Sequence, residues 1–198
     1  MSPQSEPPTG GDAFLEQMNH ELAGWDDPLA RLRKALEKDE LQLYCQPILS
    51  LRPPSSFVMA EVLVRLREEE ALLLPPGDFL PVFEHYKMMA DLDRWVVNNV
   101  LRWLSSSPPG GFRRFSVNVS GQTLEDLAFP KFVATELLAM RVPPKALAFE
   151  VDEKDVLARP AAAAAFAQAV KRSGCAVLID GFGHRSVSFA PLKTLRVD

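Results

Sequence analysis

The sequence has few cysteines and no long apolar run, and these two absences exclude several classes of protein. Only two cysteines occur in 198 residues, Cys45 and Cys175, and each lies within an apolar stretch. Two cysteines so placed give no disulfide framework and no zinc site, and they suit a reducing compartment. No stretch approaches the ~20 apolar residues of a membrane-spanning helix, and no basic-then-apolar signal segment occurs at the N-terminus. We therefore expect a cytoplasmic protein with no membrane segment.

An excess of positive charge is also lacking. The chain has 22 Lys and Arg against 26 Asp and Glu, for a formal net charge of -4. Proteins that bind duplex nucleic acid carry a broad basic surface, so that function is not expected. A compact phosphorylated ligand stays compatible with this charge, because a metal ion and a few cations can neutralise it locally. Apolar residues make up 47% of the chain, which is enough for a sizeable core.

The chain divides into a short lead and one folded domain. Residues 1–12 are rich in Pro, Ser and Gly and predict a disordered lead, whereas 13–198 predict one domain with a leading helix. Strands are predicted over residues 41–49, 57–66, 112–120, 146–153 and 175–180. Helices are predicted over residues 13–38, 89–104, 129–140, 160–172 and 188–195, with another from about Phe79. Asp78 is expected to cap the helix that begins at about Phe79 by accepting backbone N–H bonds.

Strands alternate with helices of ten or more residues, which predicts an α/β fold with a parallel sheet built from βαβ units. Either a doubly wound sheet or a barrel satisfies this pattern. No glycine-rich phosphate motif follows the early strands, so open-sheet nucleotide folds are less favoured.

Four strands each place one oxygen-bearing side chain in the strand or at its end. These side chains are Glu61, Asn118, Glu150 and Asp180. In a barrel such positions converge at the carboxyl-terminal face, where carboxylate and amide oxygens suit Mg²⁺ or Mn²⁺. The alternative for any one of them alone is a helix cap or a surface charge.

Glu61 is the hardest of the four to explain as a surface charge. Apolar residues flank it on both sides, and a buried carboxylate without a partner costs several kcal/mol. Arg65 shares a strand face with Glu61, because side chains two and four residues apart point the same way. Its guanidinium could pair a carboxylate or hold a phosphate.

Several motifs, in the same order and spacing, resemble those of EAL domains. Glu61–Arg65 resembles the signature itself, with Val62 in place of alanine, and Phe149–Glu153 resembles the E-x-T-E motif, with Asp152 in place of threonine. Further similar segments are Leu43–Ile48, Pro76–Pro81, Leu92–Val96, Ser116–Ser120 and Ile179–Gly183. The resemblance runs from about Asp27 to Asp198.

This resemblance implies a TIM-like (β/α) barrel with one antiparallel strand, which binds cyclic di-GMP at its carboxyl-terminal face. Active members of the family use Mg²⁺ or Mn²⁺ to hydrolyse one phosphodiester bond and release linear pGpG. The metal ligands implied are Glu61, Asn118, Glu150 and Asp180. Glu153 would support the loop after Asp180. The residues implied to contact cyclic di-GMP or brace its pocket are Gln46, Arg65 and Asp93.

The sequence departs from the family in three respects that bear on catalysis. Gly181 stands where active members have a second aspartate that binds metal, and the loop after it begins with His184 in place of threonine. The lysine, glutamate and glutamine of the family's catalytic site would lie beyond Asp198, so the barrel is expected to be incomplete at its C-terminal end. A protein partner or a homodimer could then cover the open edge.

These departures favour an inactive or impaired member of the family. We expect a degenerate EAL domain that binds cyclic di-GMP, a protein partner or both, with little or no hydrolysis. The alternatives are an active Mg- or Mn-dependent phosphodiesterase that yields pGpG, and a protein-interaction module that needs no ligand.

Overall fold

The computed structural model describes residues 25, 27–51, 57–68, 72–106, 114–183 and 195–198. They form two compact units. The first holds described residues up to Gln42 together with Arg65–Tyr86, and the second holds Leu43–Val64 together with Lys87–Asp198. No helix in this described part is long and apolar enough to cross a membrane. The predicted lead at 1–12 lies outside the described residues, so its disorder stays a prediction.

The first unit contains helix α2 (Pro28–Glu37), helix α3 (Pro76–His85) and strand β3 (Leu73–Leu74). Asp27 caps α2, because its side chain accepts the N–H of Ala30 at 2.9 Å. Strand β3 pairs antiparallel with the end of β2 (Phe57–Arg67). The capping role expected for Asp78 is wrong: α3 begins at Pro76, so Asp78 lies in its first turn. Proline is tolerated at that first position because its missing N–H has no helical partner there.

The second unit is built on parallel strands, as the alternation of strands and helices predicts. Strand β2 pairs with β4, β4 with β5 and β5 with β6, all in parallel, and β1 lies at the outer side of β2 in the strand order. The strands are β1 (Leu41–Leu49), β4 (Phe115–Val119), β5 (Leu147–Asp152) and β6 (Ala176–Asp180). The helices are α4 (Met89–Ser106), α5 (Gly121–Leu124), α6 (Phe129–Ala139), α7 (Glu153–Ala158) and α8 (Pro160–Arg172), with a 3₁₀ turn at Pro144–Ala146.

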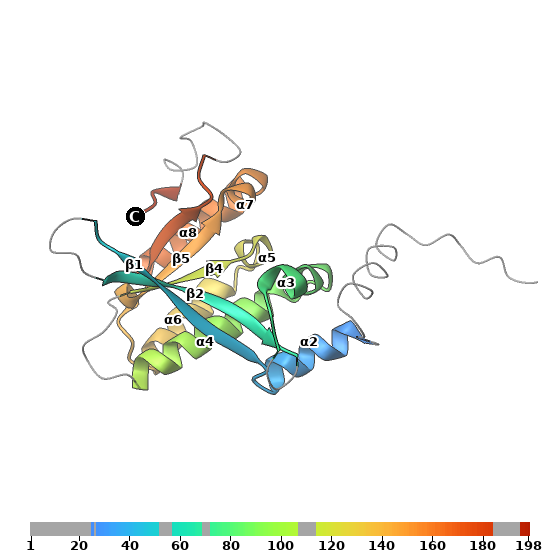
Figure 1. Ribbon diagram of the computed structural model, residues 1–198. Helices are drawn as coiled ribbons and strands as arrows, with labels where there is room; N and C mark the ends of the chain where they lie inside the picture. Colours follow the sequence, from blue (N-terminus) through green and yellow to red (C-terminus); the bar gives the residue numbers. More distant parts are fainter. Residues whose placement is uncertain (1–24, 26, 52–56, 69–71, 107–113, 184–194) are drawn as a thin grey trace, which may run out of the picture. The chain divides into compact units, whose positions relative to one another are not determined.

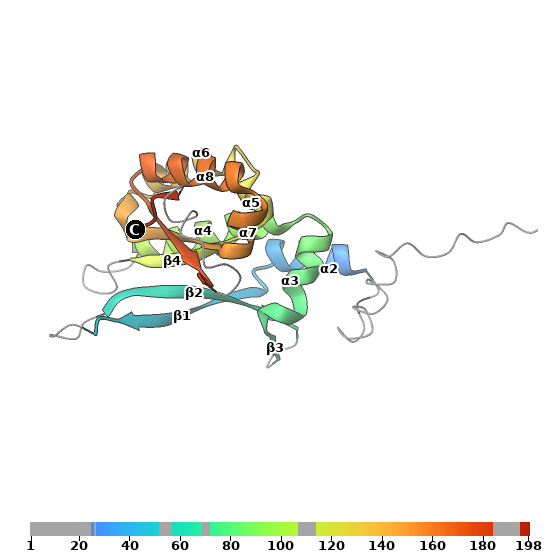
Figure 2. The same ribbon diagram turned by 90° about the horizontal axis from the view of Figure 1, so that it is seen from above.

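The core of the second unit lies between one face of its strands and the helices α4, α6 and α8 (Figure 1). Seen from above, α6 and α8 lie on the same side of β5 and β6 (Figure 2). Three buried phenylalanines join these layers: the Phe149 ring of β5 lies 6.1 Å from Phe129 of α6 and 5.7 Å from Phe166 of α8. Burying each ring stabilises the fold by about 1.5–3 kcal/mol.

In β4 and β5, the other face of the sheet carries small and polar residues. Because side chains alternate along a strand, the neighbours of Phe149 on β5, Ala148 and Glu150, point away from the helices. In β4 the same face holds Ser116 and Asn118. Folding therefore directs the apolar half of β4 and β5 to the helices and leaves the polar half for a site.

The structure contains short elements that the sequence did not predict. Helices α5 and α7 have four and six residues, and β3 has two, which is too few for a periodic pattern to show. Each of the predicted helices over 89–104, 129–140 and 160–172 is confirmed within two residues at either end. The predicted helix over 13–38 is confirmed for Pro28–Glu37, and its residues 13–24 and 26 lie outside the described part.

Candidate metal and ligand site

Four residues with side-chain oxygens lie on one face of the parallel strands. Glu61 of β2 is opposite Ser116, and Asn118 of β4 is opposite Glu150 of β5. Asp180 at the end of β6 is opposite Asp152 of β5. Residues opposite each other in parallel strands point to the same side of the sheet, so the predicted metal ligands share one face. The structure thus brings together Glu61, Asn118, Glu150 and Asp180.

Glu61 and Asn118 are in direct contact. The Asn118 side-chain N–H donates to Glu61 Oε1 at 3.0 Å. This bond occupies the amide nitrogen of Asn118 and leaves its oxygen as an acceptor. The pair therefore presents oxygen atoms from two neighbouring strands.

Glu150 lies among like charges. It is 8% exposed, and burial raises the pKa of its carboxyl group. The negative charges of Glu61 and Asp180 raise this pKa further. The Ser116 hydroxyl opposes the rise, although it does not reach the geometry of a full hydrogen bond. Among the described residues, no basic side chain offsets this repulsion at Glu150, so a divalent cation would relieve it.

The donor set fits an oxygen-preferring divalent cation in kind and in charge. Carboxylates and an amide oxygen are the ligands that Mg²⁺ and Mn²⁺ take. Over the described ranges, however, no three His, Cys, Asp or Glu side chains stand close enough to hold one ion. Holding an ion therefore requires the side chains of this face to turn toward a common point.

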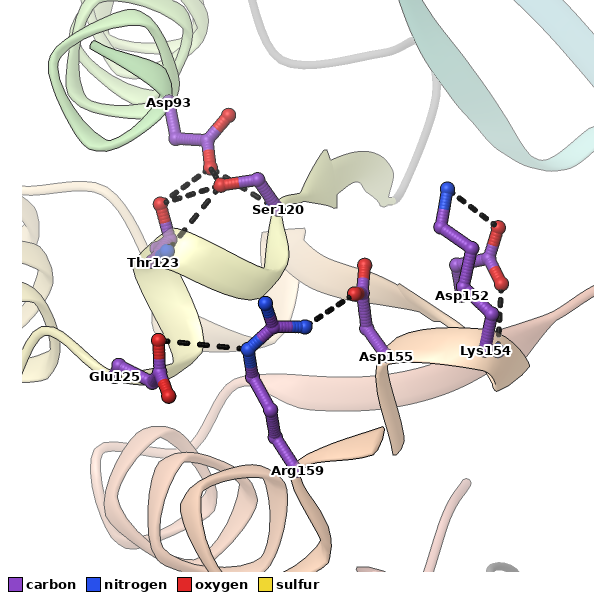
Figure 3. A network of polar contacts seen from close by, with 8 residues as sticks. All are labelled: Asp93, Ser120, Thr123, Glu125, Asp152, Lys154, Asp155 and Arg159. Carbon is purple, nitrogen blue, oxygen red and sulfur yellow. Dashed lines mark hydrogen bonds and ion pairs between the residues drawn. The ribbon is translucent and has the colours of Figure 1, made fainter. Parts of the chain in front are cut away.

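Asp93 of α4 is buried and bound to the chain that follows β4. Its Oδ2 accepts the N–H of Ser120 at 2.9 Å, the hydroxyl of Ser120 at 3.0 Å and that of Thr123 at 2.5 Å (Figure 3). Burial raises the pKa of Asp93 to about 6, and these hydrogen bonds and the charge of Arg94 limit the rise. Of the two roles implied for Asp93, this geometry fits bracing of the pocket.

The other two residues implied at the ligand are in different units. Gln46 lies in β1 and is exposed. Arg65 lies in β2, four residues after Glu61, where the first unit resumes, and it is half-buried. Each therefore lies on a strand of the fold, and the role of both at a ligand stays a prediction.

Glu153 is the other residue that the resemblance singles out. It is 1% exposed and its Oε1 accepts the N–H of Gly183 at 3.2 Å. It thereby holds the segment that follows Asp180, in keeping with the supporting role implied for it. His184 and the rest of that loop, 184–194, lie outside the described residues.

Gly181 adopts a left-handed backbone with φ of 64°, and a side chain there would meet open space. Its N–H donates to Asp180 Oδ1 at 2.8 Å. The surroundings therefore leave room for an aspartate side chain at 181, and glycine there removes a carboxylate without relieving a clash. The left-handed backbone favours glycine, although aspartate and asparagine tolerate it better than other residues do.

Sequence reasoning did not single out Ser120, Thr123 or Arg159. Ser120 caps α5 by accepting the N–H of Thr123 at 3.2 Å, and Arg159 pairs with Asp155 at 2.8 Å. Serine is a favoured N-cap residue, and Ser120 directly after a strand is a helix-start signal that could have revealed α5. Arg159 gives no such signal, because its partner Glu125 is distant in sequence.

Comparisons with known proteins agree with this architecture. The family described as "EAL domain" matches residues 29–198. Cyclic di-GMP phosphodiesterase PdeF of Escherichia coli (strain K12) is 31% identical over 169 residues, which are 85% of this chain and 22% of the relative. PdeB of Shewanella oneidensis, also a cyclic di-GMP phosphodiesterase, is 28% identical over 169 residues, 85% of this chain and 20% of that protein. The chain thus spans about a fifth of the length of these two relatives.

Solved structures give the same result for the fold. The FimX EAL domain of Pseudomonas aeruginosa bound to c-di-GMP matches with a TM-score of 0.75 and 29% identity, over 86% of this chain and 67% of that one. The c-di-GMP complex of the PaMucR phosphodiesterase matches with a TM-score of 0.77 and 28% identity, over 86% of this chain and 70% of that one. The α/β fold of the TIM-like barrel type is therefore confirmed.

Proposed function

Because the chain belongs to the EAL domain family, we propose that it acts in cyclic di-GMP signalling by binding this dinucleotide, with little or no hydrolysis. The observation that carries the proposal is the polar face of the strands, which Glu61, Asn118, Glu150 and Asp180 share, with a glycine following at 181. Two solved relatives in fold hold cyclic di-GMP, which supports the choice of ligand.

The polar face would hold one divalent cation through the oxygens of those four residues, with Mg²⁺ or Mn²⁺ as the ion. A bound ion supplies positive charge that a phosphodiester group of the ligand can meet. The repulsion of Glu150 by Glu61 and Asp180 is the physical reason for a cation at this position. Gln46 and Arg65 are proposed to contact the ligand, and Asp93 to brace the chain beside Asn118.

Slow hydrolysis is proposed from Gly181 alone. Active family members hold a second ion with an acid at this position, and glycine offers no oxygen from a side chain. Losing one preorganised electrostatic element typically lowers the rate by about 10²–10³. The segment after it is still held by Glu153 through the N–H of Gly183, so binding can persist where catalysis is weak.

Titration calorimetry of the purified chain with cyclic di-GMP, with Mn²⁺ or with Mg²⁺, tests the binding half. We expect saturable binding that weakens when Glu61 is replaced by alanine. No binding by the wild-type chain, together with recovery of a stable protein complex, would instead support an interaction module. The protein partner, the homodimer and the cytoplasmic location stay predictions.

Chromatography of the same mixtures after incubation tests the catalytic half. We expect cyclic di-GMP to remain intact over many hours. Accumulation of pGpG that disappears in Glu61→Ala would show an active phosphodiesterase and would contradict slow hydrolysis. Accumulation that persists in Glu61→Ala would point to a contaminating enzyme.

A further inference from the structure

Helix α5, which directly follows the Asn118-bearing strand, is held from two sides by charged residues (Figure 3). On one side, Asp93 of α4 accepts hydrogen bonds from Ser120 and Thr123. On the other side, the Arg159 guanidinium lies between Glu125, at the end of α5, and Asp155 of α7, at 3.4 Å and 2.8 Å. Arg159 therefore joins the segment after β4 to the segment after β5.

The position of this link matters because the backbone pairing of the two strands ends just before it. The last paired residues of β4 and β5 are Val119 and Val151. Asn118 and Glu150 each precede that last pair by one residue. Beyond the pair, no strand hydrogen bonds fix the two segments to each other, and the side chain of Arg159 spans them.

Gly121 gives an independent sign that this contact is close. A Cβ atom at position 121 would lie 2.6 Å from Arg159 Nη1 and 2.6 Å from Asp155 Oδ1. Real Cβ atoms do not approach polar side-chain atoms so closely, so the Arg159–Asp155 pair rests directly on the backbone of α5. A side chain at 121 would have to displace the ends of the Arg159 and Asp155 side chains, and because the backbone here is not left-handed, space rather than conformation distinguishes glycine at this position.

We propose that Arg159 is a positioning residue, which holds the ends of β4 and β5 together and so fixes Asn118 and Glu150 relative to each other. It does not touch the ligand or the ion. The proposal rests on the proposed function insofar as those two residues hold a cation and cyclic di-GMP. The contact joins α5, which follows β4, to α7, which follows β5, so it is more than an ion pair within one helix.

The side-chain amide signal of Asn118 in nuclear magnetic resonance spectra of the ligand-free chain reports the positioning directly. The signal is assigned by its loss in Asn118→Asp. We expect it to move or broaden in Arg159→Gln and in Gly121→Ala. Arg159→Lys should restore part of the original position, because the lysine keeps the charge. The matched control is Arg102→Gln, which removes an exposed arginine that bonds only Asn99 among the described contacts.

Binding is measured on the same variants with cyclic di-GMP and Mn²⁺. We expect affinity about three- to tenfold weaker in Arg159→Gln, with a thermal midpoint within about 2 °C of wild type. The double variant with Gly121→Ala should be no weaker than the weaker single variant, because both changes disrupt one contact.

An Asn118 signal unchanged in Arg159→Gln would overturn the positioning role, whatever the affinity. A signal that moves equally in Arg102→Gln would overturn it too. If the wild-type chain does not bind cyclic di-GMP, the proposed function fails, and the Asn118 signal still decides the role of Arg159.

Discussion

The buried carboxyl group of Asp93 should make the stability of this domain fall as the pH rises through a defined window. Asp93 is 5% exposed, and its pKa of about 6 lies above the model-compound value of 3.8. A pKa raised in the folded state means that the folded protein binds a proton more tightly than the unfolded chain. The contribution is fully present below about pH 4, is lost between about pH 4 and 6, and does not change further above that.

The size of this effect follows from the shift of about two pH units. At 1.36 kcal/mol per unit, the free energy of unfolding should fall by about 3 kcal/mol across the window, relative to a chain without the titrating group. Asp93→Asn provides that reference, because one amide oxygen can still accept from Ser120 and Thr123. Other titrating groups are common to both chains and cancel in the difference.

Urea unfolding of wild type and Asp93→Asn at several pH values between 4 and 7 measures this difference. Thr123→Val removes one hydroxyl that lowers the pKa of Asp93, so it should make the total fall larger and extend it to a higher pH. Thr135→Val, an exposed position on α6, is the matched control and should leave the wild-type curve unchanged. A difference between wild type and Asp93→Asn that stays flat, or that rises with pH, would refute the reasoning.

Three further changes test other parts of the structure. Glu150→Gln removes a buried charge that Glu61 and Asp180 repel, so the free energy of unfolding of the metal-free protein, measured in urea, should rise by about 1 kcal/mol. The stabilisation by added Mn²⁺ should disappear in this variant. Equal stabilisation by Mn²⁺ in both chains would contradict a cation at Glu150. Gly181→Asp places an acid in open space at some cost in backbone strain, so it should lower the thermal midpoint slightly. It should also increase pGpG formation, measured by chromatography. Unchanged pGpG formation would mean that Gly181 is not what limits hydrolysis. Phe166→Ala opens a cavity beside Phe129 and Phe149 and should lower the free energy of unfolding by about 3–5 kcal/mol, whereas a loss below 1 kcal/mol would mean that the ring is not part of a packed core.

Much of the fold follows from local patterns in the longer strands and helices of the chain. The alternation in SVNVS puts Val117 and Val119 on the helix side and Ser116 and Asn118 on the other, and the structure agrees. The long helices α4, α6 and α8 have enough turns for apolar spacing to be visible. Helices α5 and α7 are too short for that, so tertiary contacts rather than periodicity determine where they lie.

The residues of the candidate site were named from the sequence one by one, and their roles at a metal stay predictions; the relations between these residues were not predicted. Positions within the strands or at their ends place Glu61, Asn118, Glu150 and Asp180 on one face of a parallel sheet, since side chains in register share a face. Sequence alone could not tell that Asn118 bonds Glu61, that Glu150 is nearly buried among like charges, or that Asp93 binds Ser120 and Thr123. Those facts depend on distances between segments that are far apart along the chain.

What the sequence determined by itself is therefore the kind of fold, the family and the oxygen-bearing set on the strands, because these depend on local periodicity and on motifs with fixed spacing. Tertiary structure alone decided which charges repel and which hydroxyls support Asp93. It also decided that Arg159 pairs with Glu125, 34 residues away in the sequence, and so links α5 to α7. Burial and electrostatic interaction act through space, and a pattern read along the chain carries no measure of that space.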